Sequence, residues 1–265
     1  MSRSFGRLAR AALAVFFGLL VISQPVAAMR VSPMVLEMEA TGGGSVARVE
    51  VQNINQGRLA FETRVYRMEI DTNGQITETP ADDDFLIFPP QGVLAPGGRQ
   101  VVRLQWVGEP EIPTSQSYYV SVEQLPVAFD EGSEDEVAAQ VQVLYNLRAL
   151  VVVSPPDARP EVTAKSARAS AYEVPPSPGS DAAALTVQGV QVVLKNTGRR
   201  HAMMSNFGWK LEGKDEDGNF LRVDVSPEEL SQAVGTGFVP ALGERTFNLP
   251  ITGFGESPIE LTFKR

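Results

Sequence analysis

Short runs in which apolar and polar residues alternate recur roughly every ten residues along the chain, separated by Gly, Pro, Asn and Asp. Period-two alternation of β-branched and aromatic residues is typical of strands, and little of the chain shows the period of a helix. In the first half we expect strands at residues 31–38, 46–53, 60–70, 86–88, 99–106, 117–125 and 137–153. Strands of this number and spacing fit one immunoglobulin-like sandwich.

A short proline-rich stretch, Ser-Pro-Pro-Asp-Ala-Arg-Pro at residues 154–160, is typical of a stiff hinge. Strand patterns resume beyond it at residues 185–196, 207–212, 220–225, 245–249 and 259–263, and an exposed loop is expected at residues 172–183. The pattern therefore predicts an all-β protein with two sandwich domains. The predicted units are a signal peptide (1–28), an N-terminal domain (29–154), a hinge (155–160) and a C-terminal domain (161–265).

The first residues have the pattern of an export signal. Arg3, Arg7 and Arg10 precede the apolar run 11–22, and a small-residue cleavage pattern ends at Ala28. A membrane anchor is the alternative, but the run is shorter than the about 20 residues that a spanning helix needs. We expect an exported protein that has no membrane span after cleavage.

Charge and cysteine content narrow the function. The chain has 23 basic and 32 acidic residues and no cysteine. Without the three arginines of the expected signal, 20 basic residues face 32 acidic ones, which gives a net charge of −12. Nucleic-acid binding needs a basic footprint, so we expect no nucleic-acid partner. With no disulfides available, hydrophobic cores must hold the fold.

Residues for catalysis are scarce. His201 is the single histidine, follows a turn and is expected to be a partly exposed loop residue, although a hydrolase would have to use it. Residues 82–84 are three aspartates without the spacing or the glycine of a calcium loop, which favours a solvated acidic turn. We therefore predict no catalytic residue, no metal and no cofactor, which favours a binding protein.

Residues 141–153, VQVLYNLRALVVV, form the most unusual stretch. The first seven residues alternate, with large apolar side chains on one side, and the rest, apart from Arg148, are apolar on both sides. An acidic segment at residues 130–136 precedes it. A strand of this kind passes from a surface into a buried region, and the acidic segment is expected to be a solvated connector that helps to keep the strand soluble.

Several motifs, in order, resemble those of the periplasmic chaperones of the chaperone-usher pathway. They are RVSPMVLEM, FPPQGVLAPGGRQVVRLQW, SYYVSVEQLP and VQVLYNLRALVVVSPP in the first domain, and VVLKNTGRRHA and VPALGERTFNL in the second. The resemblance implies two immunoglobulin-like β-sandwich domains in a boomerang arrangement.

In that family the seventh strand of the first domain is lent to a pilus subunit that lacks a strand, which is donor-strand complementation. The resemblance places Val141, Val143, Tyr145 and Leu147 at the subunit-binding positions, with their side chains facing outward. The alternative is that these side chains face the core of their own domain, because alternation does not identify the faces.

The family holds the terminal carboxylate of the subunit with an arginine on the first strand and a lysine late on the seventh. Val35 and Leu150 stand at those positions here, and neither binds a carboxylate. Arg148, Arg103 and Arg30 are the candidate replacements, because a guanidinium fits a carboxylate well. For each of them a surface charge is the alternative.

These observations predict a periplasmic chaperone that binds pilus or surface-fibre subunits and delivers them to an outer-membrane usher. A surface-exposed structural or adhesive protein of two β-sandwiches is the alternative. An exposed apolar donor strand also leads us to expect that the free protein covers it by reversible self-association.

Overall fold

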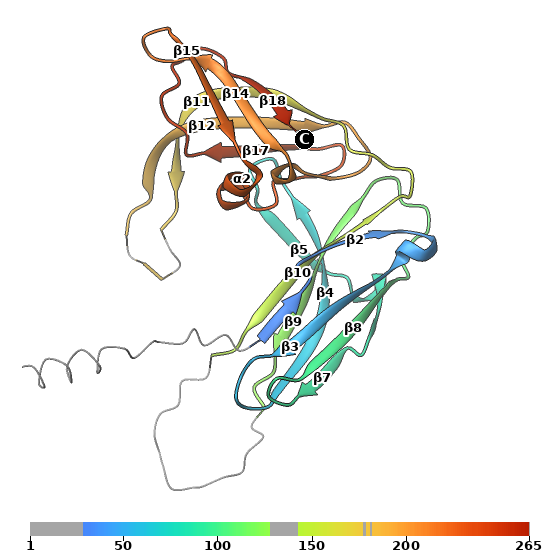
Figure 1. Cartoon of the computed structure of the whole chain (residues 1–265). Coiled ribbons are helices and arrows are strands. Elements are labelled where there is room, and N and C mark those ends of the chain that lie inside the picture. The colour runs from blue at the N-terminus through green and yellow to red at the C-terminus, as the bar shows by residue number, and fades with distance from the viewer. Residues whose placement is uncertain (1–28, 128–142, 177–178, 181, 265) are drawn as a thin grey trace, which may run out of the picture.

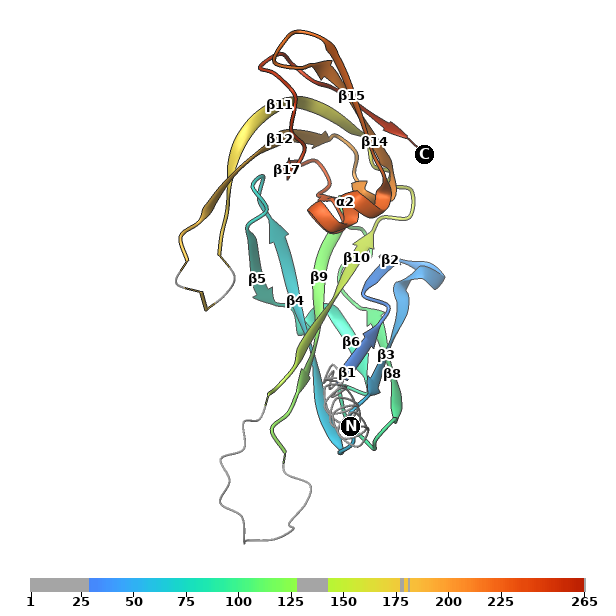
Figure 2. The same cartoon turned by 60° about the vertical axis from the view of Figure 1, so that its left-hand side comes forward.

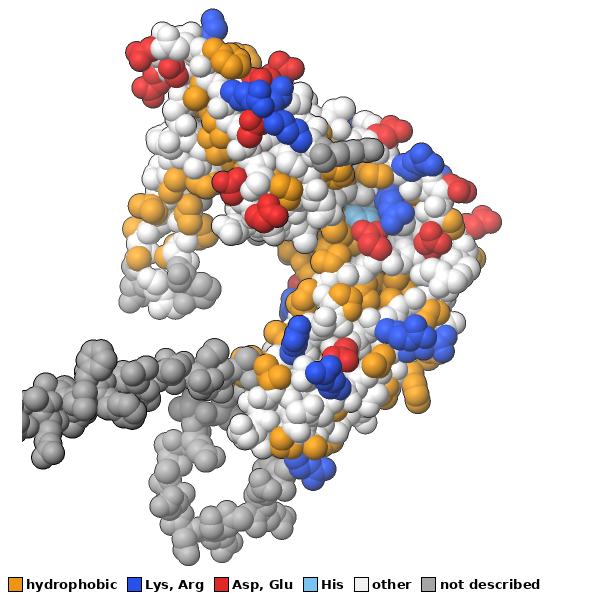
Figure 3. All heavy atoms as spheres, viewed as in Figure 1, with side chains coloured by type: hydrophobic (Ala, Val, Ile, Leu, Met, Phe, Trp, Pro, Cys, Tyr) orange, Lys and Arg blue, Asp and Glu red, His pale blue; other side chains and the backbone are white. Residues whose placement is uncertain are grey.

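The computed structural model describes residues 29–127, 143–176, 179–180 and 182–264. They form two β-sandwich domains that meet at an angle, with a hollow between them on one side (Figures 1 and 3). This confirms the prediction of an all-β protein with two immunoglobulin-like sandwiches in a boomerang arrangement. The expected signal peptide and the acidic segment 130–136 lie outside the described residues.

Two sheets form the N-terminal domain. The first has the order β1-β3-β8-β6, with β1 at Met29–Ser32, β3 at Val46–Asn53, β8 at Arg99–Trp106 and β6 at Phe85–Phe88. The second has the order β2-β10-β9-β4-β5, and β7 also pairs with β4. Its strands are β2 (Val35–Glu39), β10 (Asn146–Ser154), β9 (Gln116–Gln124), β4 (Leu59–Ile70), β5 (Ile76–Pro80) and β7 (Gln91–Leu94).

Residues that alternate along these strands meet between the two sheets. Val102 and Leu104 of β8 and Val120 and Val122 of β9 are fully buried there, because every second side chain of a strand points to the same face. The ring of Phe85 packs edge-on against Trp106 and Tyr118, at centroid distances of 5.2 and 5.0 Å. The core of this domain is therefore formed by the apolar residues that alternate with polar ones along the predicted strands.

The strand predictions for this domain need three corrections. The strand expected at residues 31–38 is two strands, because the chain changes sheets at Pro33, which has no N–H for a ladder. The strand expected at residues 137–153 begins at Asn146, and the described residues before it are not in a strand. Strands β5 and β7 were not predicted, because both are short and largely exposed.

The C-terminal domain has two main sheets. The order of one is β11-β12-β17 and that of the other is β15-β14-β18, while β13 pairs with β16. The strands are β11 (Val162–Val174), β12 (Leu185–Asn196), β13 (Ala202–Met203), β14 (Gly208–Lys214), β15 (Phe220–Val225), β16 (Phe238–Val239), β17 (Glu244–Leu249) and β18 (Glu260–Lys264). Trp209, Leu194, Leu211 and Leu249 are buried in its core.

Short helices interrupt the strands. Three 3₁₀ turns lie at Gly42–Ser45 (η1), Asp82–Asp84 (η2) and Met204–Asn206 (η3). The α-helix α2, Pro227–Val234, begins at Ser226, whose hydroxyl accepts a hydrogen bond from the Glu229 backbone while the Glu229 carboxylate accepts one from the Ser226 backbone. This capping box, with proline at the first position of the helix, fixes where the helix starts.

The loop expected at residues 172–183 begins later than predicted, because β11 continues to Val174. Strand β11 pairs with β12 over almost its whole length, up to the pair Val174 and Leu185. The resulting hairpin extends beyond the body of the C-terminal domain (Figure 2).

A third apolar cluster joins the two domains. Its buried members are Met68, Leu150 and Val152 of the N-terminal domain and Phe238 of the C-terminal domain. Val35, Ile70, Tyr119 and Met203 pack against them. Hydrophobic side chains are visible in the inner corner of the hollow between the domains (Figure 3).

Candidate functional site

Strand β10 has two different neighbours along its length. Strand β9 pairs with it antiparallel from Asn146 to Val153. Strand β2 pairs with it in parallel on the other side, but only from Leu150 to Ser154. No described strand pairs with residues 146–149 on that side, so they form an open sheet edge (Figure 2).

The backbone groups at this open edge can be assigned from the register. The N–H of Leu150 donates to the carbonyl of Met34 at 2.8 Å, on the side of β2. Alternate residues of a strand direct their N–H and C=O groups to the same side. The groups of Asn146 and Arg148 therefore face the side on which β2 is missing, and they are placed to pair with an additional strand.

The side chains of β10 lie on two faces. Tyr145 and Leu147 are half-buried and pack against the core of the N-terminal domain, on the same face as the buried Ala149 and Val151. The expectation that these large side chains face outward is therefore wrong for Tyr145 and Leu147. The alternation was correct, but it did not show which face was the core.

The apolar stretch before β10 is more accessible. Val143 is 59% exposed and Leu144 is 47% exposed, and neither is in a strand. Val141, the first residue predicted to bind a subunit, lies outside the described residues. The described part of the predicted donor segment thus goes from an exposed start at Val143 to a half-buried Leu147.

The three candidate arginines do not come together. Arg30 on β1 and Arg103 on β8 are exposed on the outer face of the four-stranded sheet, and Arg103 donates to the side chain of Gln105 at 2.9 Å. Arg148 belongs to the other sheet, on the face that also carries Leu150 and contacts the C-terminal domain. Of the three, Arg148 is the one beside the interdomain cluster.

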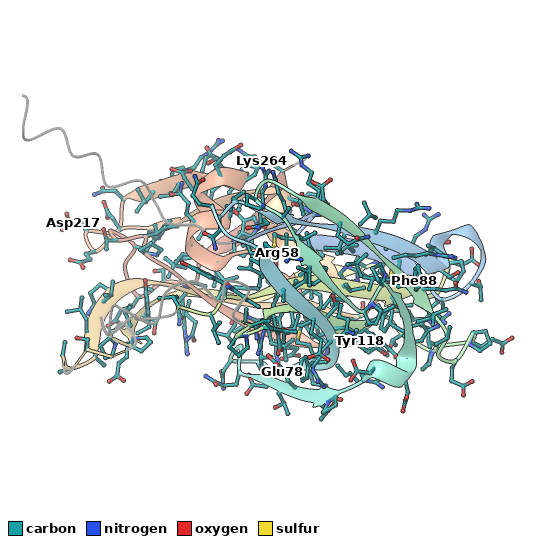
Figure 4. All side chains as sticks on the ribbon, turned by 90° about the horizontal axis from the view of Figure 1, so that it is seen from below. Arg58, Glu78, Phe88, Tyr118, Asp217 and Lys264 are labelled. Atoms are coloured by element: carbon teal, nitrogen blue, oxygen red, sulfur yellow. The ribbon has the colours of Figure 1, made fainter. Side chains whose placement is uncertain are left out.

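Arg148 already has partners in its own domain. Its Nη1 forms an ion pair with Oε1 of Glu78, and its Cζ lies 6.0 Å from the centroid of the Tyr66 ring. Glu78 comes from β5 and is labelled in Figure 4. The guanidinium is thereby held on the outer face of the sheet while part of it stays accessible.

Val35 and Leu150, the residues at the family's charged positions, are direct neighbours in the structure. They are register partners in the parallel pair of β2 and β10. Both belong to the apolar cluster between the domains, where Leu150 is buried. The position is therefore occupied by an apolar contact between the domains.

His201 is not the partly exposed loop residue that was predicted. It is buried between the domains, with Nε2 at 2.8 Å from Oε1 of Glu37 on β2 and its ring stacked on Phe238. Arg200 donates to the other carboxylate oxygen of Glu37 at 2.7 Å. The backbone N–H of His201 donates to the hydroxyl of Ser115 at 2.9 Å. The residue has a structural role in holding the two domains together.

This contact explains the ionisation of Glu37. Burial by itself raises the pKa of Glu37, but the hydrogen bonds and charges of His201 and Arg200 outweigh burial and lower that pKa to about 2. The carboxylate is therefore ionised at neutral pH, which makes Nε2 of His201 the donor in the pair.

Sequence reasoning missed Arg245. It lies on β17, and its Nη1 donates to the carbonyl of Phe238 at 3.2 Å. Its Nε is buried and has no hydrogen-bond partner among the described residues. The motif VPALGERTFNL contains this residue, but only the tertiary structure places it beside the other domain.

Two of the three aspartates at residues 82–84 have structural partners. Asp82 accepts a hydrogen bond from the backbone N–H of Val65, and Asp84 accepts one from the hydroxyl of Tyr118. Within the described residues no group of three or more His, Cys, Asp or Glu is arranged to hold a metal ion. No helix in that part of the chain is long and apolar enough to cross a membrane.

Comparison with solved structures supports the two-domain fold. The class 5 fimbriae chaperone CfaA has a TM-score of 0.51 and 10% sequence identity, with 89% of this chain and 99% of that chain covered. A chain of the Salmonella enterica complex of SafA pilin with the SafB chaperone has a TM-score of 0.50 and 12% identity, covering 91% and 98%. A chain of the chaperone–tip adhesin complex of CFA/I fimbriae biogenesis has a TM-score of 0.50 and 10% identity, covering 90% and 99%.

A search of curated protein sequences found no match. Residues 29–159 match the family model for pili and flagellar-assembly chaperones, PapD N-terminal domain. This match includes every strand of the N-terminal domain, from β1 to β10. Together with the two-domain fold, it shows that the chain belongs to the family of pilus assembly chaperones.

Proposed function

We propose that this protein is a periplasmic chaperone that binds pilus or surface-fibre subunits by donor-strand complementation and delivers them to an outer-membrane usher. The observation that carries the proposal is the open edge of β10 at residues 146–149, where backbone groups face a side that no described strand occupies. Membership of the pilus chaperone family supports it. The function is binding, without catalysis.

Addition of a strand at this edge would use backbone hydrogen bonds and apolar side-chain contacts. The backbone groups of Asn146 and Arg148 supply hydrogen bonds to the added strand, and apolar side chains supply specificity. Tyr145 and Leu147 lie at the margin of the domain core, so an incomplete sandwich docked here would extend that core across both proteins. Val141 and Val143 remain predicted contacts further along the segment.

We infer the kind of binding partner from the complexes in which similar chains were solved. One similar chain is from a complex of a pilin with its chaperone, and another is from a chaperone–tip adhesin complex. We extend that partner class to this chain. The expected export signal, residues 1–28, supports a periplasmic location, and delivery to an usher follows from the family.

The open edge also distinguishes this proposal from the adhesive alternative. An unpaired strand edge invites aggregation, so a protein that stays on the surface is expected to cover its edges. A chaperone has to leave one available for its subunit. In the free protein, reversible self-association through this edge remains our prediction.

The test is co-expression with a candidate pilus subunit from the same organism, followed by purification of the complex. Asn146→Pro removes an N–H that faces the open edge without removing one that faces β9. Val143→Asp introduces a charge into the apolar contact, where an unpaired charge costs several kcal/mol. We expect both variants to stay folded and to lose the complex.

Two variants serve as controls. Asn146→Ala keeps the N–H at the open edge, and Phe220→Asp places the same charge at a 73% exposed apolar position on β15 of the other domain. Both should retain the complex. A normal yield of complex from Asn146→Pro and from Val143→Asp would exclude donor-strand binding at this edge.

A further inference from the structure

The hairpin of β11 and β12 continues beyond the sheet to which it belongs. Strand β17 pairs with β12 only from Val190 onward, whereas β11 pairs with β12 as far as the pair Val174 and Leu185. Residues 170–174 and 185–189 therefore form a ribbon of two strands, which no third strand joins among the described residues. Two-stranded ribbons are marginally stable in water by themselves, so contacts between their side chains have to support them.

The apolar face of the hairpin changes sides along its length. Within the sheet, Ala167, Val190 and Val192 point to the core. The other face there carries Arg168, which donates to the side chain of Gln191 at 3.1 Å. Since side chains alternate between the two faces of a strand, the residues of the ribbon can be assigned to the same two faces.

The assignment separates polar from apolar side chains in the ribbon. The residues that continue the core face are Ala171, Glu173, Thr186 and Gln188, and those on the opposite face are Tyr172, Val174, Leu185 and Val187. The large apolar side chains of the ribbon thus lie on the face that does not continue the core of the domain. Packing in that core does not explain them.

These four apolar side chains are organised but not covered. Leu185 is 66% exposed and Val174 is 41% exposed, and none of the four belongs to a hydrophobic cluster of the described residues. Tyr172 and Val187 are register partners. The ring of Tyr172 lies over Gly189, where a Cβ would be 2.8 Å from its Cε1 atom. Because pairs of aromatic and β-branched residues stabilise neighbouring strands, the face is held in place while it stays accessible.

The size of this apolar face limits what can bind to it. Four side chains offer at most about 400 Å², which is on the order of the largest apolar patch on an ordinary monomer. A stable interface buries about 800 Å² on each partner, so the ribbon cannot hold a second copy of the chain through this face alone. The face is suited to a partner that is already held elsewhere on the molecule, because a second contact then forms at a high effective concentration.

The position of the ribbon indicates this partner. Figure 1 shows the ribbon on one side of the hollow between the domains, and β5 and β10 of the N-terminal domain on the other. Hydrophobic side chains gather on the ribbon where it borders the hollow (Figure 3). An immunoglobulin-like subunit of about 120 residues has a radius of gyration of about 14 Å. When such a subunit docks at residues 146–149, its body extends well beyond the edge of β10.

We propose that the apolar face of the ribbon, formed by Tyr172, Val174, Leu185 and Val187, contacts the body of the subunit whose strand is held on β10. The inference rests on the proposed function. The open edge of β10 holds one strand of the subunit, and the ribbon makes a second, apolar contact on the other side of the hollow. The C-terminal domain thereby takes part in binding through side chains that its own core does not use.

The test measures how fast the subunit leaves the protein. A pilus subunit from the same organism is purified in complex with each variant, and its transfer to an excess of tagged wild-type protein is followed with time. Leu185→Asp should release the subunit at least about tenfold faster than the wild type, because a charge in an apolar contact is costly and interface changes act mainly on dissociation. Leu185→Met keeps the contact apolar and should release the subunit at close to the wild-type rate.

Thr186→Asp is the matched control, because Thr186 is the next residue of the same strand and is exposed on the opposite face. It should release the subunit at the wild-type rate. Both positions are exposed in the free protein, so neither change should alter its unfolding in urea. An unchanged release rate in Leu185→Asp, or an equal acceleration in both variants, overturns the ribbon contact.

The outcomes separate this inference from the proposed function. If Asn146→Pro forms no complex and Leu185→Asp releases the subunit at the wild-type rate, donor-strand binding stands and the ribbon contact is wrong. If Leu185→Asp only abolishes self-association of the free protein in sedimentation, a second copy covers the face, which also overturns the inference. Failure of the wild type to form any complex overturns the proposed function together with the ribbon contact.

Discussion

The two halves of β10 belong to one strand but have different surroundings. From Leu150 to Val153 the strand lies between β9 and β2, and Val151, Val152 and Val153 are fully buried. From Asn146 to Ala149 it has β9 on one side and an open edge on the other. The difference begins at a single residue, Leu150, because β2 begins pairing there.

This difference shows how one strand combines a structural and a binding role. The buried half anchors the strand in the core of the N-terminal domain and in the cluster that joins the domains. The open half is then held extended, so its backbone groups do not have to be ordered when a partner arrives. Such preorganisation lowers the entropic cost of binding.

The largest contrast between the two halves should appear in stability. Val152→Asp places a charge in the apolar cluster between the domains, where the side chain is 0% exposed. We expect a loss of at least about 3 kcal/mol in the free energy of unfolding, because the buried charge has no partner. Urea unfolding followed by fluorescence measures it.

The matched change before the open half is Val143→Asp, at a side chain that is 59% exposed. Its effect on the free energy of unfolding should stay within about 0.5 kcal/mol, as for most surface substitutions. Similar losses for the two variants would mean that Val143 is also part of the folded core, and the contrast would be lost.

Strand β2, which pairs with the second half of β10, also contacts the C-terminal domain, because its Glu37 binds Arg200 and His201. The stability that this contact provides should depend on pH. The pKa of Glu37 falls from the ordinary value of 4.5 to about 2. A lowered carboxyl pKa stabilises the fold above the unfolded value, and that stabilisation is lost as the pH falls toward the folded value.

Glu37→Gln should therefore be less stable than the wild type at pH 7, by about 1 kcal/mol after allowing for screening of a partly exposed group by solvent. The difference should shrink as the pH is lowered from 4.5 toward 3. Unfolding curves of both proteins across this range measure it. A difference that grows toward acid pH would contradict the role given to the Glu37 carboxylate.

The sequence predicted those strands best whose alternation is bounded by clear turns. Residues 46–53 and 99–106 have the predicted bounds as β3 and β8, and residues 185–196 have them as β12. Strand β11 was missed because it is rich in Ala and Ser and much of it is exposed, so it lacks the apolar period of a half-buried strand. Helix α2 carries a capping box, but Leu230 is its single buried residue, so its apolar period is weak.

The candidate site was also predictable only as far as local alternation of apolar and polar residues reaches. Alternation in residues 141–147 identified the stretch before and within β10, but not the face toward which Tyr145 and Leu147 point. His201 and Arg245 depend on contacts between residues far apart in the sequence, such as the pair of Glu37 and His201. Local patterns carry no signal for contacts of that kind.

The smallest expected effect is a difference in the hydrogen-exchange rates of single backbone amides along β10, with no change in the stability of the protein. In the free protein at low concentration, the N–H groups of Asn146 and Arg148 face the open edge, whereas those of Leu147 and Ala149 face β9. Hydrogen exchange should therefore alternate along the open half, fast at Asn146 and Arg148 and slow at Leu147 and Ala149. From Leu150 to Val153 every amide has a neighbouring strand on its side, so all of them should exchange slowly.

Binding should remove this alternation. When the subunit adds its strand, the amides of Asn146 and Arg148 gain acceptors and should become as slow as their neighbours, while the buried half changes little. A rise in protection with protein concentration, in the absence of subunit, would reveal self-association through the same edge. Exchange followed by NMR at two concentrations, and again with the subunit, separates these cases. Slow exchange at Asn146 and Arg148 in the dilute free protein would show that the edge is already covered, and the contrast between the two halves of β10 would then not exist in solution.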